Sequence, residues 1–214
     1  MNTLIMNNNL KRQGWRSRGY MPHRDHSGLV QSITFRLSDS LPGHVREKIE
    51  KELLEQDIAP SKIERARNRL REKYLDSGMG SCALGHPRMA QVMKESLLKF
   101  HGERYELIAW CIMPNHVHVM ISQKAPLAKI IQSWKSYPAR WGMENGLRYG
   151  FTIPDVVDES GRRRFWMWEY WDRYIRDEKH YYRVRGYIHQ NPVKAGLCED
   201  CKEWRWSSAW EQGK

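Results

Sequence analysis

Hydrophobic and polar residues alternate in part along Leu29–Leu37, which predicts a β-strand that ends at the turn-forming segment SDSLPG. Beyond it, apolar residues recur every fourth position over His44–Gln56, and again after an interruption at Pro60. Ser61 and Glu64 have the spacing of a capping box at the start of the second segment, which the glycines of DSGMGS end. Two amphipathic helices are therefore expected, with these residues on their inner faces: Val45, Ile49 and Leu53, then Ile63, Ala66, Leu70 and Tyr74.

A β-hairpin between two helices is predicted next. The first helix should begin at Pro87 and turn Ala90, Met93 and Leu97 inward. The segments YELIAWCIM and HVHVMIS have strand character and are joined by a short PN corner. The segment LAKIIQSWKSYPARW then predicts a basic amphipathic helix that is interrupted at Pro138.

The remaining pattern completes a fold of mixed type. Residues 142–165 contain four glycines and are expected to form a long loop. FWMWEYWDRYI contains a short aromatic strand, after which Asp177 should cap a helix that ends near Asn191, because Pro192 follows. The order β-α-α-α-β-β-α-β-α, with a hairpin between neighbouring strands, predicts an α+β sandwich on a mainly antiparallel sheet.

Charge points to an anionic polymer as the partner. The formal net charge is +11 and the pI is about 9.6. Basic residues concentrate in an N-terminal arm, residues 1–28, and in residues 161–194. Ten tryptophans and ten tyrosines accompany them. Flat aromatic rings among arginines suit single-stranded nucleic acid, whose bases stack and whose phosphates need cations, although a hydrophobic core and a solvated face would give the same composition.

The compartment is expected to be the cytoplasm. No apolar run approaches the ~20 residues that a membrane span needs. The first residues lack the apolar stretch and cleavage site of a secretory signal. Of four cysteines, Cys198 and Cys201 alone have metal-ligand spacing, and no second pair completes a structural zinc site, so we expect reduced thiols.

Two histidines, His116 and His118, stand one residue apart on a predicted strand and must therefore point to the same face. Two converging imidazoles can ligate one divalent ion, while Val117, Val119 and Ile121 face the core on the opposite side. The same spacing also describes polar residues on the solvated face of an ordinary strand. A metal site needs a third ligand and a reaction for the ion to assist.

Both requirements lead to the segment GYIHQNPVKAGL, at positions 186–197. Helical spacing places Arg183, Tyr187 and Asn191 on one stripe, so that Tyr187 is a candidate nucleophile and Asn191 a candidate oxygen ligand. A half-buried aromatic residue and a helix-end residue before proline are the ordinary alternatives. Gly186 costs roughly 1 kcal/mol inside a helix, which suggests that a bulky neighbour approaches closely or that the helix bends there.

The pair MPNHVHVMI and YIHQNPVKAGL resembles the single-tyrosine HUH transposases, in their REP-associated tyrosine transposase branch. The segments RGYMPH, ITFRLSDSLP and WRWSSA support the resemblance, which runs from about Gly14 to Trp210. It implies a ferredoxin-like αβ sandwich, with the HUH motif on a central strand and the nucleophile on a C-terminal helix. Residues 29–197 would form this domain, between the arm of residues 1–28 and a tail of residues 198–214.

The resemblance also implies an activity, a metal and a substrate. The enzyme would be a Mg²⁺- or Mn²⁺-dependent nuclease and strand transferase that cuts single-stranded DNA beside short hairpins and forms a 5′-phosphotyrosine at Tyr187. His116 and His118 would hold the metal together with a polar residue one turn beyond the tyrosine, which Asn191 matches, with His189 as the alternative. Related transposases often dimerise through their sheets, so a homodimer is an open prospect, and DNA binding would associate the protein with the nucleoid.

We expect DNA contacts from basic residues near this site, and each such contact would add to the salt dependence of binding. The candidates are Arg16 and Arg18 in the arm, Arg162, Arg163 and Arg164 in the loop, and Arg183 on the tyrosine helix. Two other functions remain open. One is a hairpin-binding regulator with the same fold and no catalysis, and the other is a metal-dependent hydrolase that activates water.

Overall fold

The computed structural model describes residues 15–17, 22–24 and 27–213. Its main sheet has four antiparallel strands in the order β4-β5-β3-β6, formed by Tyr105–Ile112, His116–Gln123, Val30–Arg36 and Trp171–Tyr174. With the helices between them, these strands give a β-α-β-β-α-β sequence with the first and third strands in the centre. This is the ferredoxin-like topology, so the predicted fold is confirmed.

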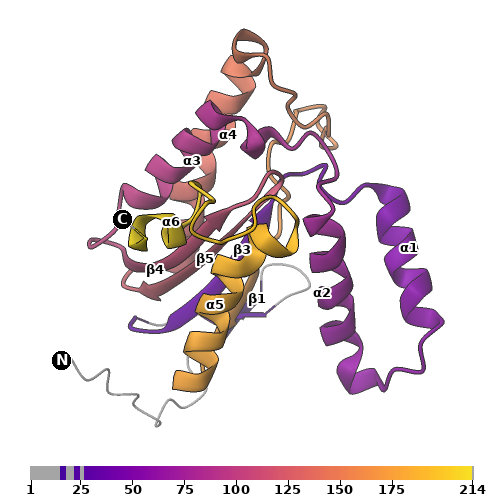
Figure 1. Ribbon diagram of the computed structural model, residues 1–214. Coiled ribbons are helices and arrows are strands. Elements are labelled where there is room, and N and C mark those ends of the chain that lie inside the picture. The colour runs from indigo at the N-terminus through magenta and orange to yellow at the C-terminus, as the bar shows by residue number, and fades with distance from the viewer. Residues whose placement is uncertain (1–14, 18–21, 25–26, 214) are drawn as a thin grey trace.

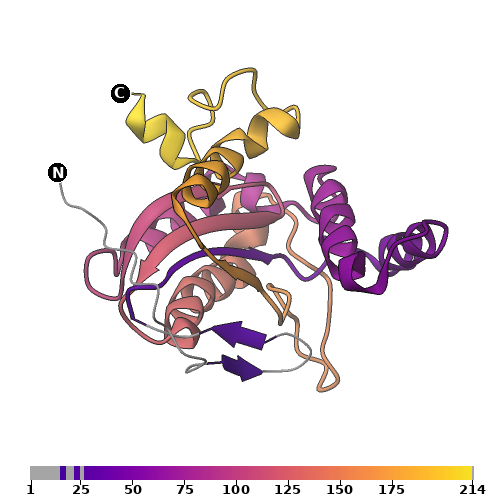
Figure 2. The same cartoon turned by 90° about the horizontal axis from the view of Figure 1, so that it is seen from below.

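Helices cover both faces of the sheet (Figures 1 and 2). Helices α3 (Pro87–Leu98) and α4 (Leu127–Tyr149) pack on one face, over a core that includes Val117, Val119 and Ile121. Helix α5 (Glu178–Lys194) covers the other face and contacts β4 and β5. The alternation of side chains along β5 therefore divides the molecule into a purely structural face and a face that carries the two histidines.

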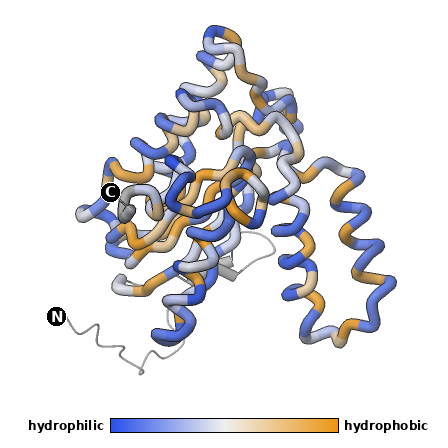
Figure 3. The backbone as a smooth tube through the Cα atoms, in the orientation of Figure 1, coloured by the Kyte–Doolittle hydropathy of each residue, from blue (hydrophilic) through white to orange (hydrophobic). Residues whose placement is uncertain are grey.

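An α-helical hairpin stands beside this sandwich, formed by α1 (Gly43–Leu54) and α2 (Pro60–Asp76). Its helices share a small core of their own, built from Val45, Ile49, Leu53, Ala66, Tyr74 and Leu75. Both helices alternate hydrophobic and hydrophilic segments along their length (Figure 3). Pro60 is the first residue of α2, and Ala59 before it is the N-cap residue. No side chain makes a capping hydrogen bond there, so the capping box predicted at Ser61 and Glu64 is wrong.

The prediction of a loop over 142–165 is wrong for its first third, because α4 continues through Pro138 to Tyr149. Two of the four glycines taken as loop signals, Gly142 and Gly146, are packing residues. A Cβ at Gly142 would lie 2.6 Å from Cε2 of Phe165, and one at Gly146 would lie 2.7 Å from Cγ2 of Ile153. The returning chain crosses the helix at these two positions, and only Gly150, with φ of 72°, ends it.

Helix α5 likewise passes the proline expected to stop it and ends at Lys194, with Pro192 buried inside it. Its start agrees with the prediction, since the Asp177 side chain accepts a hydrogen bond from the backbone N–H of His180 at 2.7 Å. No heavy atom lies within 4 Å of a Cβ placed on Gly186, so the expected close approach of a neighbour is not found there.

The short elements surround this core. Strands β1 (Trp15–Ser17) and β2 (Pro22–Arg24) pair with each other, a 3-10 turn η1 spans Ala83–Gly85, and α6 spans Ser208–Gln212. The segment before α6 runs along the outer edge of β4, where the Ile112 N–H donates to the Trp206 carbonyl at 2.8 Å. Within the described ranges, no helix is long and apolar enough to cross a membrane.

Candidate active site

The two histidines lie on the α5 side of β5, where His116 pairs with Arg36 of β3 and His118 pairs with Thr34 of β3 and Cys111 of β4. They are 1% and 2% exposed. The alternative of two polar residues on a solvated strand face is therefore excluded by their burial. A buried imidazole needs partners for its ring nitrogens, and those partners determine what the site can do.

The protonation of His116 is determined by Asn115. The Asn115 side-chain N–H₂ donates to the backbone carbonyls of Leu75 and Met79 at 3.1 and 3.0 Å, so its Oδ1 must face His116 Nδ1, which lies 2.7 Å away. Nδ1 is then the ring nitrogen that carries the proton and donates it. In the neutral ring the lone pair is on Nε2, the atom that faces the centre of the site. Burial lowers the pKa of His116 and keeps the ring neutral.

His118 presents the same atom to the same place. Its Nδ1 lies 2.9 Å from the Thr34 hydroxyl, and its Nε2 lies 2.9 Å from Nε2 of His116. Burial lowers the pKa of His118 to about 3, so this ring is also neutral near pH 7. A hydroxyl can accept from Nδ1, and that arrangement would leave both Nε2 lone pairs free for one cation.

Helix α5 brings Tyr187 and Asn191 onto this pair. The rings of His118 and Tyr187 meet edge to face, with centroids 5.6 Å apart. Asn191, one turn later, is fully buried and donates its side-chain N–H to the Tyr187 carbonyl at 3.2 Å. Its amide adjoins His118, and its Oδ1 is buried with no hydrogen-bond partner. A buried amide oxygen beside the His118 imidazole is a donor atom that a cation held by that ring could use.

The alternative ligand, His189, is turned elsewhere. Its Nε2 lies 2.9 Å from the hydroxyl of Ser208, which itself hydrogen-bonds the backbone of Trp110 on β4. Two residues along a helix change the face by about 200°, and this contact shows the consequence. Of the two predicted third ligands, only Asn191 reaches the histidines.

Two carboxylates that sequence reasoning missed complete the site. Glu72 and Asp76 lie one turn apart at the end of α2. Glu72 accepts a hydrogen bond from the Tyr187 hydroxyl, and burial raises its pKa. One Asp76 oxygen, Oδ1, lies 3.8 Å from His116 Nε2 and has no hydrogen-bond partner, and burial raises the pKa of this residue to about 6. Nothing in the local pattern of α2 distinguishes these acids from its other solvent-facing charges.

Lys194, in the last turn of α5, was also missed. Its Nζ lies 4.4 Å from the centre of the Tyr187 ring, within the range of a cation–π contact. Burial and then the charge of Glu72 raise the pKa of Tyr187, so the phenol is protonated in the resting site. Glu72 thus supplies an acceptor for the hydroxyl of the phenol, and Lys194 supplies a cation close to its ring.

The donor set suits a hard or borderline divalent ion. Two imidazole nitrogens and one or two oxygens match the ligands of Mn²⁺, and Mg²⁺ accepts oxygen ligands together with substrate phosphate. In the described part of the chain, no three His, Cys, Asp or Glu side chains already surround one point. The nearest approach to such a set is His116, His118 and the orphaned oxygens of Asn191 and Asp76.

The predicted DNA-binding arginines lie farther out. Those of the loop after α4 engage acids of the same loop, since Arg163 pairs with Asp155 at 3.4 Å and Arg164 with Asp158 at 3.9 Å. Arg162 is exposed, and its backbone N–H donates to the Asp158 carboxylate. Beside them Trp168 is 75% exposed, with the Arg164 guanidinium 6.0 Å from its ring centre.

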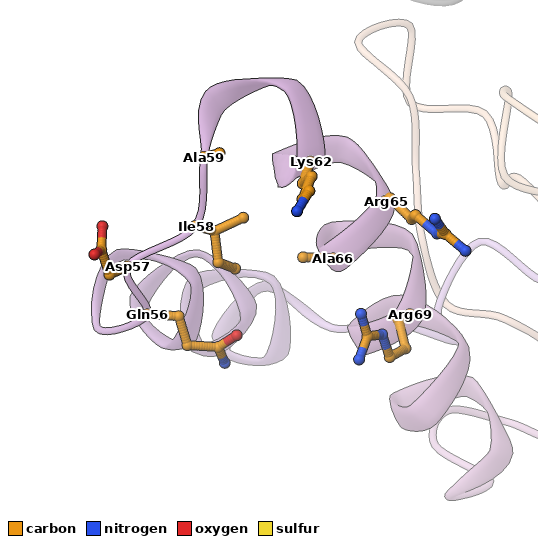
Figure 4. Close-up of a pocket in the computed structure, with 8 residues that line it drawn as sticks. All are labelled: Gln56, Asp57, Ile58, Ala59, Lys62, Arg65, Ala66 and Arg69. Carbon is orange, nitrogen blue, oxygen red and sulfur yellow. The ribbon is translucent and has the colours of Figure 1, made fainter.

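Arg183 is exposed on α5, one turn before Tyr187. Arg16 belongs to β1, where the structure describes the backbone alone, and Arg18 lies outside the described residues. A separate basic hollow lies between the far ends of α1 and α2, lined by Lys62, Arg65 and Arg69 (Figure 4). It is remote in sequence from the histidine pair.

Comparison with known proteins identifies the chain. The family model described as "Transposase IS200 like" matches residues 85–191, which include the histidine pair and the tyrosine helix. A putative REP-associated tyrosine transposase of Haemophilus influenzae is 28% identical over 49% of this chain and 58% of its own length. The REP-associated tyrosine transposase of Escherichia coli is 24% identical over 55% of this chain and 63% of its own.

A solved structure shares the fold. It is a REP-associated tyrosine transposase bound to a REP hairpin, with a TM-score of 0.51 and 15% identity, over 87% of this chain and 79% of that one. The matched part of the chain spans less than two thirds of the curated relatives' lengths. The chain belongs to the IS200-like transposase family, and the relatives it resembles within that family are REP-associated tyrosine transposases.

Proposed function

We propose that this transposase cuts and rejoins single-stranded DNA beside a hairpin through a covalent link to Tyr187. The observation that carries the proposal is the position of the Tyr187 phenol. Its hydroxyl donates to Glu72, and its ring packs against His118. His118 and His116 are the two neutral imidazoles whose Nε2 atoms converge. A phenol on a helix above a pair of imidazoles is a nucleophile beside a phosphate-activating centre.

In the cutting step, the Tyr187 oxygen forms a bond to phosphorus and the bond from phosphorus to the 3′ oxygen breaks. The phenolic proton passes to Glu72, which already accepts a hydrogen bond from that hydroxyl. Lys194 stabilises the developing phenolate from the ring face. The 3′ oxygen leaves and takes up a proton from solvent to become a hydroxyl, and the 5′ end remains attached to the protein as a phosphotyrosine.

Rejoining reverses these steps with a 3′-hydroxyl as the nucleophile, because the phenol is a better leaving group than a sugar hydroxyl. His116, His118 and Asn191 would hold Mg²⁺ or Mn²⁺, and the ion would supply Lewis-acid polarisation of the scissile phosphate. The neutrality of both rings, which burial enforces, keeps their Nε2 atoms available for that ion.

The substrate assignment rests on charge and exposed aromatic surface. The net charge of +11 favours a polyanion, and the exposed Trp168 beside Arg164 offers a stacking platform for an unpaired base. The related structure is named for its bound REP hairpin. A hairpin next to a single strand would place the duplex against cationic surface and the strand over Tyr187.

The test is covalent capture. The full chain is incubated with Mn²⁺ and a labelled oligonucleotide that carries a hairpin beside a single strand, and adducts are separated on a denaturing gel. The wild type, Tyr181→Phe and Tyr182→Phe should form the adduct, and Tyr187→Phe should not. These two controls remove phenols from the same helix. An adduct that persists in Tyr187→Phe would refute the assignment of the nucleophile.

The same assay separates the other two functions. A hairpin-binding regulator would bind the oligonucleotide tightly without any adduct, and His116→Ala would leave that binding unchanged. A hydrolase would cut the strand and leave product ends free of protein. Either result would replace the proposed function.

Two further parts of the proposal concern assembly and location. DNA as substrate would associate the protein with the nucleoid in the cytoplasm. A homodimer through the edge of β4 would have to displace the C-terminal segment that bonds Ile112 and pairs Cys111 with Ser207. We therefore expect two copies not to associate through β4 while this segment is bound, which light scattering of the full chain would test.

A further inference from the structure

The end of α2 is fixed against the histidine strand by one side chain. Asn115 donates to the carbonyls of Leu75 and Met79. Leu75 comes directly before Asp76 in the chain, and Met79 comes three residues after it. The same Asn115 holds His116 through Nδ1. The position of Asp76 relative to His116 is therefore determined by a shared buried anchor, and it does not depend on a flexible loop.

The Asp76 carboxylate is in an unfavourable place for a structural residue. It is the last residue of α2, at the negative end of the helix dipole. Its Oδ1 is buried without a hydrogen-bond partner, and its neighbour one turn back, Glu72, carries the same charge. Lys194 acts on Asp76 as a nearby positive charge, but Oδ1 has no hydrogen-bond partner. Burying a carboxylate oxygen in that state is costly, so a cation bound directly to Oδ1 is the simplest account of it.

The geometry around Asp76 suits a shared cation. Two ligands of one ion, each at about 2.1 Å, lie roughly 3 Å apart when adjacent and about 4.2 Å apart when opposite. The two Nε2 atoms are 2.9 Å apart, and Asp76 Oδ1 is 3.8 Å from the nearer one. The second orphaned oxygen, Oδ1 of the fully buried Asn191, adjoins His118 from α5.

We infer that Asp76 is a further metal ligand, supplied by the α1–α2 hairpin to the ion that His116, His118 and Asn191 hold. The inference rests on the proposed function, since it concerns the ion of that site. It gives the hairpin a role in the active site: Asp76 binds the metal, and Glu72 one turn earlier binds the nucleophile. It also supplies the carboxylate whose charge makes two neutral imidazoles and an amide a stronger site for a hard ion.

The experiment measures Mn²⁺ binding to the full chain in the absence of DNA, from the electron paramagnetic resonance signal of free Mn²⁺. Asp76→Asn keeps the shape and removes the charge, and we expect it to weaken binding at least tenfold. Asp76→Glu keeps the charge and should bind Mn²⁺ more tightly than Asp76→Asn. Asp57→Asn is the matched control, because Asp57 is an exposed acid of the same hairpin, and it should bind as the wild type does.

Thermal melting provides a second reading that a merely structural role would not give. Without metal, Asp76→Asn should melt at or above the wild-type temperature, because it removes an unpaired buried charge. Added Mn²⁺ should raise the melting temperature of the wild type and of Asp57→Asn, and have little effect on Asp76→Asn. A metal-free Asp76→Asn that melts well below the wild type would instead assign Asp76 a structural role and overturn the inference.

His116→Ala separates this inference from the proposed function. If His116→Ala binds Mn²⁺ as the wild type does, the metal centre of the proposed function is wrong. If His116→Ala loses binding while Asp76→Asn stays within twofold of the wild type, the metal centre stands and the role of Asp76 is refuted.

Discussion

Removing the Asn115 side chain should damage both the fold and the metal site, because this one amide makes three buried contacts. In Asn115→Ala, the carbonyls of Leu75 and Met79 lose their donors, and the His116 Nδ1–H loses its acceptor. A net loss of about 1 kcal/mol for each of the three hydrogen bonds, and about 1–2 kcal/mol more for the stranded imidazole N–H, gives a destabilisation of about 4–5 kcal/mol. A domain of ordinary stability would remain folded.

The effect on metal binding should exceed the effect of instability alone. Loss of the residue that hydrogen-bonds the other ring nitrogen of a metal-bound histidine typically weakens metal affinity by about 10- to 100-fold, because the ring is then free to rotate or to change its tautomer. Urea unfolding measures the first effect, and Mn²⁺ titration of the folded protein measures the second. Asn145→Ala is the control, since Asn145 donates to the Trp141 carbonyl within its own helix, α4, and lies far from the histidines in sequence. Wild-type Mn²⁺ affinity in a correctly folded Asn115→Ala would refute the tautomer argument.

Three other outcomes are expected. Gly142→Ala should lower the free energy of unfolding by about 1–3 kcal/mol, because its Cβ would meet the Phe165 ring, whereas Gly186→Ala should raise it by up to about 1 kcal/mol; equal effects in urea unfolding would contradict this. In metal-free buffer, the free energy of unfolding should fall as the pH drops below 6.5, because the unfolded chain protonates His118, whose folded pKa is about 3, along with the other site histidine. Asp76, with a raised pKa of about 6, and Glu72, whose pKa burial also raises, oppose this, but the pKa values of His180 and His189 are lowered as well, so the histidines bind more protons on unfolding than the two acids release. Stability that increases between pH 7.5 and 5 would contradict the assignment. Trp168→Ala should weaken binding of an unpaired oligonucleotide by about 1–3 kcal/mol in a fluorescence titration and leave Mn²⁺ affinity unchanged.

The strands and the histidine geometry could be predicted from the sequence because they depend on local pattern. Alternation along β5 determines that Val117 faces the core and that its two histidine neighbours face the other side, whatever packs there. The stripe of Tyr187 and Asn191 follows from helical spacing in the same way. These local patterns predict which face of the strand or helix each side chain occupies. The resemblance of MPNHVHVMI and YIHQNPVKAGL to one family then predicted that the two faces form a single site.

The errors came from residues whose role depends on distant partners. Gly142 and Gly146 look like loop residues until Phe165 and Ile153 are found against them, and Pro138 then lies within a continuous helix. In the same way Pro192 is carried inside α5 by burial rather than ending it. Propensity is a weak effect of about 1 kcal/mol per glycine, and tertiary packing outweighs it at such positions.

The carboxylates of α2 show why a site can be larger than its motifs. Glu72 and Asp76 lie 40 residues or more from the histidines in sequence, on the polar side of a helix whose own pattern is satisfied by packing against α1. Their position at the metal site arises from Asn115, which binds the end of α2 to the strand that carries the histidines. A polar residue directly before a pair of candidate ligands can therefore have two roles. It can orient the neighbouring ligand, and its other atoms can hold a distant helix or strand against the site.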